Sequence, residues 1–325
     1  MKLFKRSEFV IAVILLLSMV VIGLINPAFW QLDNLFSLMR SNVIIGIMAL
    51  GVLVVMISGG IDVSFPAFAV AAMYLTVKGM IFFGHDGVII PFIAAAMMGM
   101  LFGCLNAFFV YKFKMIPLIV TLGTGSMVRG FLLGIVGTSM ININKMPDGL
   151  IDFAKTEVIS MTKPDGTYFG LTAMVLIYVG LALLVHFVLR YTMIGRSVYA
   201  LGGDSEAAKR VGFDVRRTTF FIYCFAGMLA GFGGLLHSGM IWLANPRDFV
   251  GLELDVIAAV VLGGASIFGG RGSVLGTMLG VFMLVMVKNS LIIMKVETTW
   301  QRVVVGIVIV IATAMTAWRD RKRNV

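Results

Sequence analysis

Residues 43–58 read VIIGIMALGVLVVMIS and contain no charged side chain. An uncharged run of this kind is typical of a helix surrounded by lipid. Nine further apolar runs lie on either side of it, broken by glycine, proline, asparagine or charged residues. They are 9–25, 66–83, 88–111, 116–137, 169–189, 218–243, 254–267, 274–294 and 302–318. The sequence therefore predicts an all-α fold, a polytopic transmembrane helical bundle of about ten spans. The limits of 43–58, 254–267 and 302–318 are the least sharply marked, because these runs are short or flanked by glycine.

The composition excludes an ordinary soluble enzyme and a disordered chain. Hydrophobic residues make up 60% of the 325 residues and charged residues 13%, and the mean hydropathy is +1.02. Soluble domains are near half apolar and a quarter charged. The apolar runs are long and unbroken rather than alternating, which argues against a transmembrane β-barrel. The first run, 9–25, is followed by Asn26-Pro27 without a small-x-small cleavage pattern, so we interpret it as an uncleaved span.

The basic residues indicate the orientation of the chain. The net charge of +10 would suggest nucleic acid in a soluble protein, but here the basic residues lie at the ends of apolar runs. If the N-terminus is inside, the inner segments carry 16 of the 26 Lys and Arg and the outer ones nine, while Arg129 lies within a span. This bias predicts that both termini are cytoplasmic. We expect no nucleic-acid partner.

The sequence contains no catalytic signature. No Gly-Lys-Ser/Thr occurs, so a Walker A motif is absent and we expect no ATP hydrolysis by this chain itself. No Ser/His/Asp or His/Cys cluster occurs either, so we expect neither a catalytic site, a metal site nor a cofactor. Cys104 and Cys224 lie inside apolar runs and are interpreted as packed thiols. The whole chain, 1–325, is interpreted as a single transmembrane domain.

The cytoplasmic loop 190–217 is more polar than a connector requires. Residues 205–212 read SEAAKRVG, which predicts a short helix. Asp204 or Ser205 is placed to cap its N-terminus, and Glu206 lies in the first turn, where the helix dipole favours an acid. Two alanines form a small packing face, two basic residues occupy the last turn, and Gly212 ends the helix. Such a helix is either a docking element for a partner or a solvated helix at the membrane surface.

The same residues carry a resemblance to a known family. Glu206, Ala207 and Ala208, followed after three residues by Gly212, are similar to the EAA coupling motif of permeases from ATP-binding-cassette (ABC) importers. Residues 58–64, SGGIDVS, resemble the SGGIDLS signature of the ribose/xylose-type sugar permeases, with Val63 in place of the usual leucine.

Two further stretches resemble the same sugar permeases. Residues 262–276, LGGASIFGGRGSVLG, are similar to their late glycine-rich stretch, and residues 117–124, PLIVTLGT, followed by Arg129-Gly130, resemble their fifth span. The matches run in order from about residue 40 to 317, so the resemblance covers nearly the whole chain. By itself, the glycine-rich stretch indicates a tight cytoplasmic turn with close helix packing.

The resemblance implies the permease subunit of an ABC importer, which forms the translocation path for a monosaccharide. It implies three partners: ABC ATPase subunits, a second permease chain that is identical or paralogous, and an extracytoplasmic sugar-binding protein. It leaves autoinducer-2-like molecules and nucleosides open as substrates. The ATPase would dock on loop 190–217, and the coupling residues carried over from the motif are Glu206, Ala207, Ala208, Arg210 and Gly212.

Arg129 is a candidate for the translocation path, because a charge within a span is costly and normally faces the bundle interior or water. It lies about 13 residues into its span, roughly 20 Å from the cytoplasmic side at about 1.5 Å per residue. The alternative is a structural role, in which Arg129 contacts helix carbonyl groups or an acid of an outer loop.

Four more polar residues are candidates for the same path. Asn106, Thr121 and Thr124 could line it, or instead make hydrogen bonds between helices. Asp62 could act as a path or gate residue, or cap the next helix through Ser64 or backbone N–H groups.

An ion-coupled secondary transporter of a small polar solute is the main alternative function. Such proteins use titratable or cation-binding groups near the middle of the bilayer. Asp62 and Asp255 lie at the ends of predicted spans, and this function leaves the long basic loop unexplained.

Overall fold

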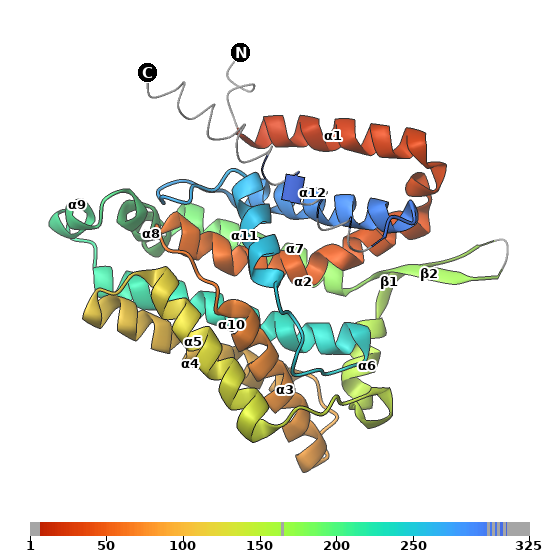
Figure 1. The fold of residues 1–325 in the computed structure, drawn as a ribbon, viewed down its shortest axis with the longest axis horizontal. Helices are drawn as coiled ribbons and strands as arrows, with labels where there is room; N and C mark the ends of the chain where they lie inside the picture. Colours follow the sequence, from red (N-terminus) through yellow and green to blue (C-terminus); the bar gives the residue numbers. More distant parts are fainter. Residues whose placement is uncertain are drawn as a thin grey trace.

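Eight helices are long and apolar enough to cross a membrane among the residues that the computed structural model describes, which are 7–163, 166–297, 300, 303, 306, 307 and 310. They confirm an all-α, polytopic helical bundle (Figure 1). The eight are α1 (Ser7–Ile25), α2 (Leu32–Ile57), α3 (Phe65–Phe83), α4 (Ile89–Phe113), α5 (Pro117–Phe131) with its π-helical continuation η3 (Leu132–Val136), α7 (Met174–Tyr191), α10 (Val215–Ile241) and α12 (Val274–Ile293).

The last three predicted spans have different outcomes. The run 274–294 is confirmed as α12. The run 254–267 is helical only as α11 (Leu252–Leu262), whose 11 residues extend about 17 Å and are too short to cross a hydrocarbon core of about 30 Å alone. The helix is therefore shorter than the predicted run, because it stops at the glycines that follow Leu262, and the number of spans stays a prediction. Most of the run 302–318 lies outside the described residues.

The segment 138–168, between the predicted spans 116–137 and 169–189, is structured. It contains the 3₁₀ turn η4 (Ile143–Lys145), the helix α6 (Asp148–Lys155) and the strand β1 (Glu157–Thr162). An antiparallel hairpin joins β1 to β2 (Tyr168–Thr172), with Ser160 opposite Gly170. The apolar run predicted from residue 169 therefore begins as a strand and becomes helical only at Met174. The remaining short elements are η2 (Pro27–Trp30), α8 (Met193–Gly203) and α9 (Ser205–Arg210).

The helices divide into central and peripheral ones according to burial. The most apolar window of α2 is 83% buried, and α2 contacts α7, α10, α11 and α12. A helix that is apolar on all sides is expected to be buried, and α2 lies at the centre of the bundle and forms part of its core. The corresponding window of α1 is only 11% buried, and Leu16, Leu17 and Leu24 are exposed. The side chains of α1 therefore face the surroundings, which is lipid for a chain of this composition.

The helices α4 and α10 pack with their backbones in contact. Each helix contributes one pair of glycines, and the two glycines of a pair are four residues apart. A Cβ atom built on Gly99 would lie 2.1 Å from the backbone oxygen of Gly227, and one on Gly231 would lie 2.2 Å from the oxygen of Ala95. One on Gly103 would lie 2.1 Å from the backbone oxygen of Tyr223. Small residues at this spacing allow helix backbones to touch in membranes. The contact holds α10 in a fixed position relative to α4.

The glycine-rich stretch 262–276 forms a turn and a close helix contact, as predicted. The α11 helix ends at Leu262 and α12 begins at Val274. A Cβ atom on Gly276 would lie 2.1 Å from the backbone oxygen of Gly263, so the ends of the two helices touch. The turn between them is tied to the end of α2, because Gly270 N donates to Ile57 O at 2.8 Å.

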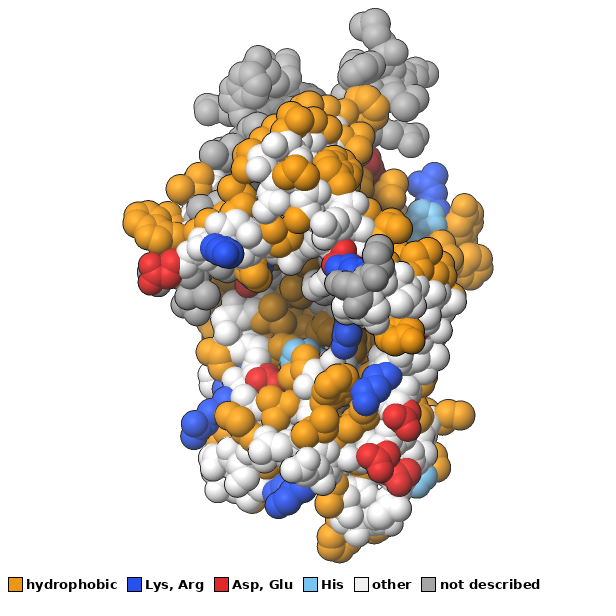
Figure 2. Space-filling model, turned by 90° about the vertical axis from the view of Figure 1, so that its right-hand side faces the viewer, with side chains coloured by type: hydrophobic (Ala, Val, Ile, Leu, Met, Phe, Trp, Pro, Cys, Tyr) orange, Lys and Arg blue, Asp and Glu red, His pale blue; other side chains and the backbone are white. Residues whose placement is uncertain are grey.

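The hairpin and α9 lie at opposite ends of the long axis of the molecule (Figure 1). This agrees with a chain whose loop 138–168 faces one side of the membrane and whose loop 190–217 faces the other. Figure 2 views the molecule from the hairpin side and shows a hollow lined largely by apolar side chains, with histidine, acidic and basic side chains around it.

Candidate translocation path and coupling helix

The fold brings four of the predicted path residues together in one buried network. The segment between α2 and α3 carries Asp62, whose Oδ1 accepts hydrogen bonds from the Ser64 backbone N–H (2.7 Å) and from Ser64 Oγ (2.6 Å). Asn106 on α4 donates from Nδ2 to Ser64 Oγ at 2.8 Å. Thr124 on α5 donates from Oγ1 to Asn106 Oδ1 at 2.6 Å. Thr121, one turn earlier, accepts from the Val63 N–H at 3.3 Å.

This network links the 58–64 segment to two spans. Asp62, Ser64, Asn106, Thr121 and Thr124 are all buried. Buried polar groups are expensive unless they are hydrogen-bonded, so these contacts specify the packing of α4 and α5 against the irregular segment. The structure thus contains the predicted interactions of Asp62 with Ser64 and the interhelical hydrogen bonds of Asn106 and Thr124. A direct role of these residues in transport stays a prediction.

Arg129 lies apart from this network. It occupies the last turn of α5, and its Nη1 donates to the backbone oxygen of Asp248 at 3.5 Å, a long hydrogen bond. Its guanidinium also interacts electrostatically with Glu253 at the start of α11. The loop between α10 and α11 therefore supplies a carbonyl group and the first turn of α11 supplies an acid, and these are the kinds of structural partner considered for Arg129. Its role in the translocation path stays a prediction.

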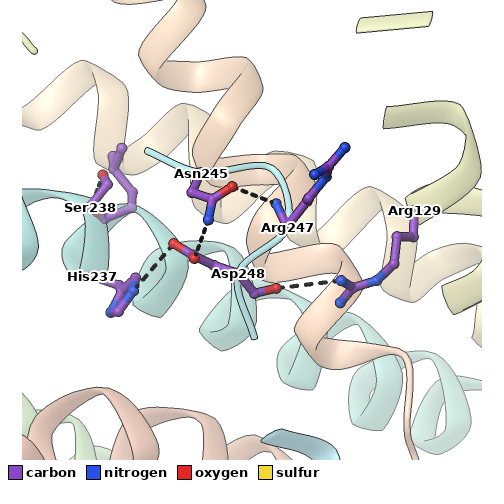
Figure 3. Close-up of polar contacts among 7 residues, drawn as sticks. Arg129, His237, Ser238, Asn245, Arg247 and Asp248 are labelled. Carbon is purple, nitrogen blue, oxygen red and sulfur yellow. Dashed lines mark hydrogen bonds and ion pairs between the residues drawn. The ribbon is translucent and has the colours of Figure 1, made fainter. Parts of the chain in front are cut away.

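The same loop forms a polar cluster that sequence reasoning missed (Figure 3). His237 Nε2, near the end of α10, lies 3.6 Å from Asp248 Oδ2, and both side chains are about four-fifths buried. Asn245 Nδ2 donates to Asp248 Oδ1 at 2.9 Å, and the Asn245 side-chain oxygen accepts from the Arg247 N–H at 3.1 Å. The ten residues between His237 and Asp248 form no recognisable motif, because the chain must first turn back on itself.

The outer cluster, defined as Arg129, His237, Asn245 and Asp248, combines hydrogen-bond donors and acceptors. The ring of Phe249 lies 4.5 Å from the His237 ring, centroid to centroid, and adds an apolar surface. Polar groups placed beside an aromatic face are a common arrangement for binding small polar solutes. Within the described ranges, no three His, Cys, Asp or Glu side chains gather in the way a metal site requires.

The predicted cytoplasmic helix is confirmed as α9, and both of its ends are capped. Asp204 is the N-cap, and its Oδ1 accepts from the N–H groups of Glu206 (2.9 Å) and Ala207 (3.0 Å). These backbone hydrogen bonds, with that from Ala207 the larger effect, hold the pKa of Asp204 below its ordinary value. The cap is therefore ionised at neutral pH.

The C-terminal end of α9 is a Schellman motif. Phe213 N donates to Ala208 O at 3.1 Å, and Gly212 N donates to Lys209 O at 3.1 Å. Gly212 has a φ of +93°, in the left-handed region that favours glycine. Of the predicted coupling residues, Ala208 is buried, whereas the side chains of Glu206, Ala207 and Arg210 are exposed. The structure therefore presents a polar helix that is capped at both ends, and its coupling role stays a prediction.

Comparison with known proteins identifies the family. Residues 34–313 match the model of the family described as branched-chain amino acid transport system / permease component. The chain belongs to this permease family. No solved structure matches the permease.

Curated relatives cover nearly the whole permease. It is 35% identical over 310 residues to the ribose import permease protein of Bacillus subtilis, covering 95% of this chain and 91% of that protein. It is 33% identical to a probable ABC transporter permease protein, YphD, of Escherichia coli, covering 94% of this chain and 88% of that protein. It is 28% identical to the galactose/methyl galactoside import permease protein of Haemophilus influenzae, covering 99% of this chain and 97% of that protein. The resemblance to ABC importer permeases of the ribose type is therefore confirmed.

Proposed function

We propose that this permease is the membrane-spanning subunit of a bacterial inner-membrane ABC importer and that it conducts a monosaccharide. The proposal is supported by relatives named as ribose and galactose import permeases. The observation that carries it is α9, a short helix capped at both ends that lies at the end of the molecule opposite the outer hairpin (Figure 1). A membrane channel or a secondary transporter has no need of such a helix, whereas an importer driven by a separate ATPase requires a docking element.

The assembly follows from this assignment. Two permease chains, identical or paralogous, would form one path, and two ATPase subunits would dock on the 190–217 loops. A soluble sugar-binding protein would deliver the substrate at the face that carries the β1–β2 hairpin. ATP hydrolysis would take place on the ATPase subunits, and the permease would alternate between outward and inward access.

The fold offers a mechanical connection between the two faces. The α9 helix contacts both α8 and α10. The α10 helix is continuous over 27 residues, about 40 Å at about 1.5 Å per residue, and carries His237 near its far end. A displacement of α9 by the ATPase would therefore move α10, and with it the outer cluster. The glycine contact between α4 and α10 would transmit the movement as a rigid-body shift rather than a local deformation.

The outer cluster suits a neutral, polyhydroxylated substrate. Arg129 and Asn245 provide N–H donors, Asp248 provides carboxylate acceptors, and Phe249 provides an apolar face. A monosaccharide presents the same combination of hydroxyl groups and apolar C–H surface. An autoinducer-2-like molecule or a nucleoside would use similar contacts, and direct binding measurements with the binding protein that delivers the substrate would separate these possibilities.

The test replaces Gly212 by valine and uses Gly203→Val as the matched control. Gly212 requires a left-handed backbone, which a β-branched residue adopts only with strain. Gly203, at the end of α8, has an ordinary φ, is exposed and has no atom within 4 Å of an added Cβ. We expect Gly212→Val to insert in the membrane at the normal level and to lose ATP-driven sugar uptake in reconstituted vesicles. Gly203→Val should retain uptake.

Two results would contradict the proposal. Uptake at the wild-type rate by Gly212→Val, with the ATPase still bound, would remove α9 from the coupling mechanism. Uptake that continues without any ATPase subunit but stops when the proton or sodium gradient is collapsed would favour the ion-coupled secondary transporter instead.

A further inference from the structure

A cavity of about 1130 Å³ lies on the α9 side of the bundle, where α1 begins, α7 ends and α12 begins. One wall is polar and carries Arg190 at the end of α7, Arg196 on α8 and Arg271 in the turn before α12. The other wall is apolar and includes Phe9, Leu189 and Leu279. The cavity is thus amphipathic, with its cations on the loop side and its apolar surface on the side of the spans.

The charges of this cavity favour an anion. Among the described residues of the lining, Glu8 is the acid, against Arg190 and Arg196; the third arginine, Arg271, already has an interaction of its own. Within the described ranges, Arg190, Arg196 and Glu8 form no ion pair, although all three line the same space. Arginine is charged at every accessible pH and its planar fork matches the oxygens of a phosphate group. Arg190 and Arg196 therefore give the described lining one positive charge more than the single negative charge of Glu8 neutralises.

Several contacts hold the polar wall in place. Tyr199 Oη donates to the Gly272 backbone oxygen at 2.8 Å, which ties α8 to the turn before α12. Thr192 Oγ1 accepts from Gly195 N at 3.1 Å and caps the start of α8, so the backbone that carries Arg196 is ordered. The first residues of α12 also line the cavity, and the positive end of the α12 dipole adds to the field of the arginines.

The position of the cavity places it at the cytoplasmic boundary of the membrane. Its walls come from the first turn of α1, the last turn of α7 and the first turn of α12, and the positive-inside rule puts all three ends on the cytoplasmic side. The cytoplasmic leaflet carries anionic phospholipids, and basic pockets between transmembrane helices on that side bind their headgroups.

We propose that this cavity binds one anionic phospholipid of the cytoplasmic leaflet, with its phosphate held by Arg190 and Arg196 and its acyl chains against the apolar wall. The apolar wall decides between a lipid and a soluble phosphate, because only a lipid would contact Phe9, Leu189 and Leu279 as well as the arginines. The bound lipid would join α1, α7 and α12 beside the loop that carries α9.

The test uses the purified full-length permease, stripped of lipid in a neutral detergent and titrated with short-chain phosphatidylglycerol. Binding is measured by native mass spectrometry and by the shift in unfolding temperature. Separate titrations with short-chain phosphatidylcholine, glycerol 3-phosphate and inorganic phosphate distinguish the charge from the lipid contribution. The variant is Arg190→Gln/Arg196→Gln, and the matched control, Lys209→Gln/Arg216→Gln, removes two exposed basic residues of the same loop that do not line the cavity.

We expect the wild type to bind phosphatidylglycerol more tightly than phosphatidylcholine. The variant should lose about 25-fold in affinity, at about fivefold for each arginine near an anionic headgroup. The control should bind as the wild type does. If the double variant does not fold, Arg196→Gln, at an exposed position, should lose about fivefold. Unchanged affinity in a folded variant, equal affinity for both lipids, or equally tight binding of glycerol 3-phosphate or inorganic phosphate would each overturn the proposal.

Discussion

Replacing Gly227 by alanine should separate α4 from α10, the contact on which the bundle depends. A Cβ atom at this position would lie 2.2 Å from the backbone oxygen of Gly99, whereas ordinary contacts begin near 3.4 Å. The two helices would therefore have to move apart by about 1.2 Å at this point. The oxygen belongs to a helix backbone, so no change of side-chain rotamer can relieve the clash.

The free energy of unfolding should fall by a predictable amount. Inserting a methyl group into a well-packed interior costs about 1–3 kcal/mol. Alanine also has a higher helix propensity than glycine, by about 1 kcal/mol, which offsets part of this cost. The matched control is Gly180→Ala on α7, where nothing lies within 4 Å of the added Cβ, so it gains the propensity without a clash. The difference between the two variants then isolates the packing cost.

Thermal unfolding of the two variants in detergent, together with sugar uptake, measures this difference. At about 2–4 °C per kcal/mol, the packing cost corresponds to a melting temperature roughly 2–12 °C lower for Gly227→Ala than for Gly180→Ala. Uptake should fall in Gly227→Ala alone, because α10 links α9 to the outer cluster. A Gly227→Ala variant that melts at or above the temperature of Gly180→Ala would refute the argument that this contact is closely packed.

Three further predictions concern single sites. We expect Arg129→Ala to insert normally and to transport poorly, with Arg129→Lys in between because lysine keeps the charge but not the planar fork; wild-type uptake and thermal stability in Arg129→Ala would exclude both a path and a structural role. Cys104 and Cys224 lie with their Sγ atoms 2.9 Å apart but are free thiols, so the double alanine variant should transport normally, and loss of uptake in a folded variant would show a role for the pair. Asp204→Asn should preserve binding to the ATPase, whereas Asp204→Ala should weaken it, as a pull-down would measure. Because the pKa of Asp204 is lowered on folding, its contribution to the stability of α9 is complete above about pH 4 and is lost as the pH falls further. Equal ATPase binding by Asp204→Ala and the wild type at pH 7 would contradict the capping role.

Local patterns in the sequence were sufficient for most of the membrane helices and for the short helix α9. A run such as 43–58 is fixed as a membrane helix by its own composition, because backbone groups in lipid must be paired within the segment. The α9 helix was equally predictable, since Asp204 and Gly212 satisfy its ends through contacts a few residues away. The full length of α2 was not, because its first turns are too polar to be recognised as part of a span.

Other features depend on residues that only the fold brings together. The network of Asp62, Asn106 and Thr124 joins positions up to 62 residues apart, and each residue alone fits a structural or a path role equally well. His237 meets Asp248 because the loop after α10 folds back over the helix end. The spacing of Gly99 and Gly103 on α4 is visible in the sequence, but the matching pair on α10 becomes its partner only when the helices cross.

The sequence by itself determined most of the membrane helices and the ends of α9, and it predicts the direction of insertion, because hydration, charge and helix capping act on neighbouring residues. Only the tertiary structure decided that α11 is a short helix packed against α12, that Arg129 contacts the loop after α10, and that Arg190, Arg196 and Arg271 surround one cavity. These outcomes depend on how helices pack side by side. Packing is governed by the shapes of surfaces that come from distant parts of the chain, and no local pattern records them.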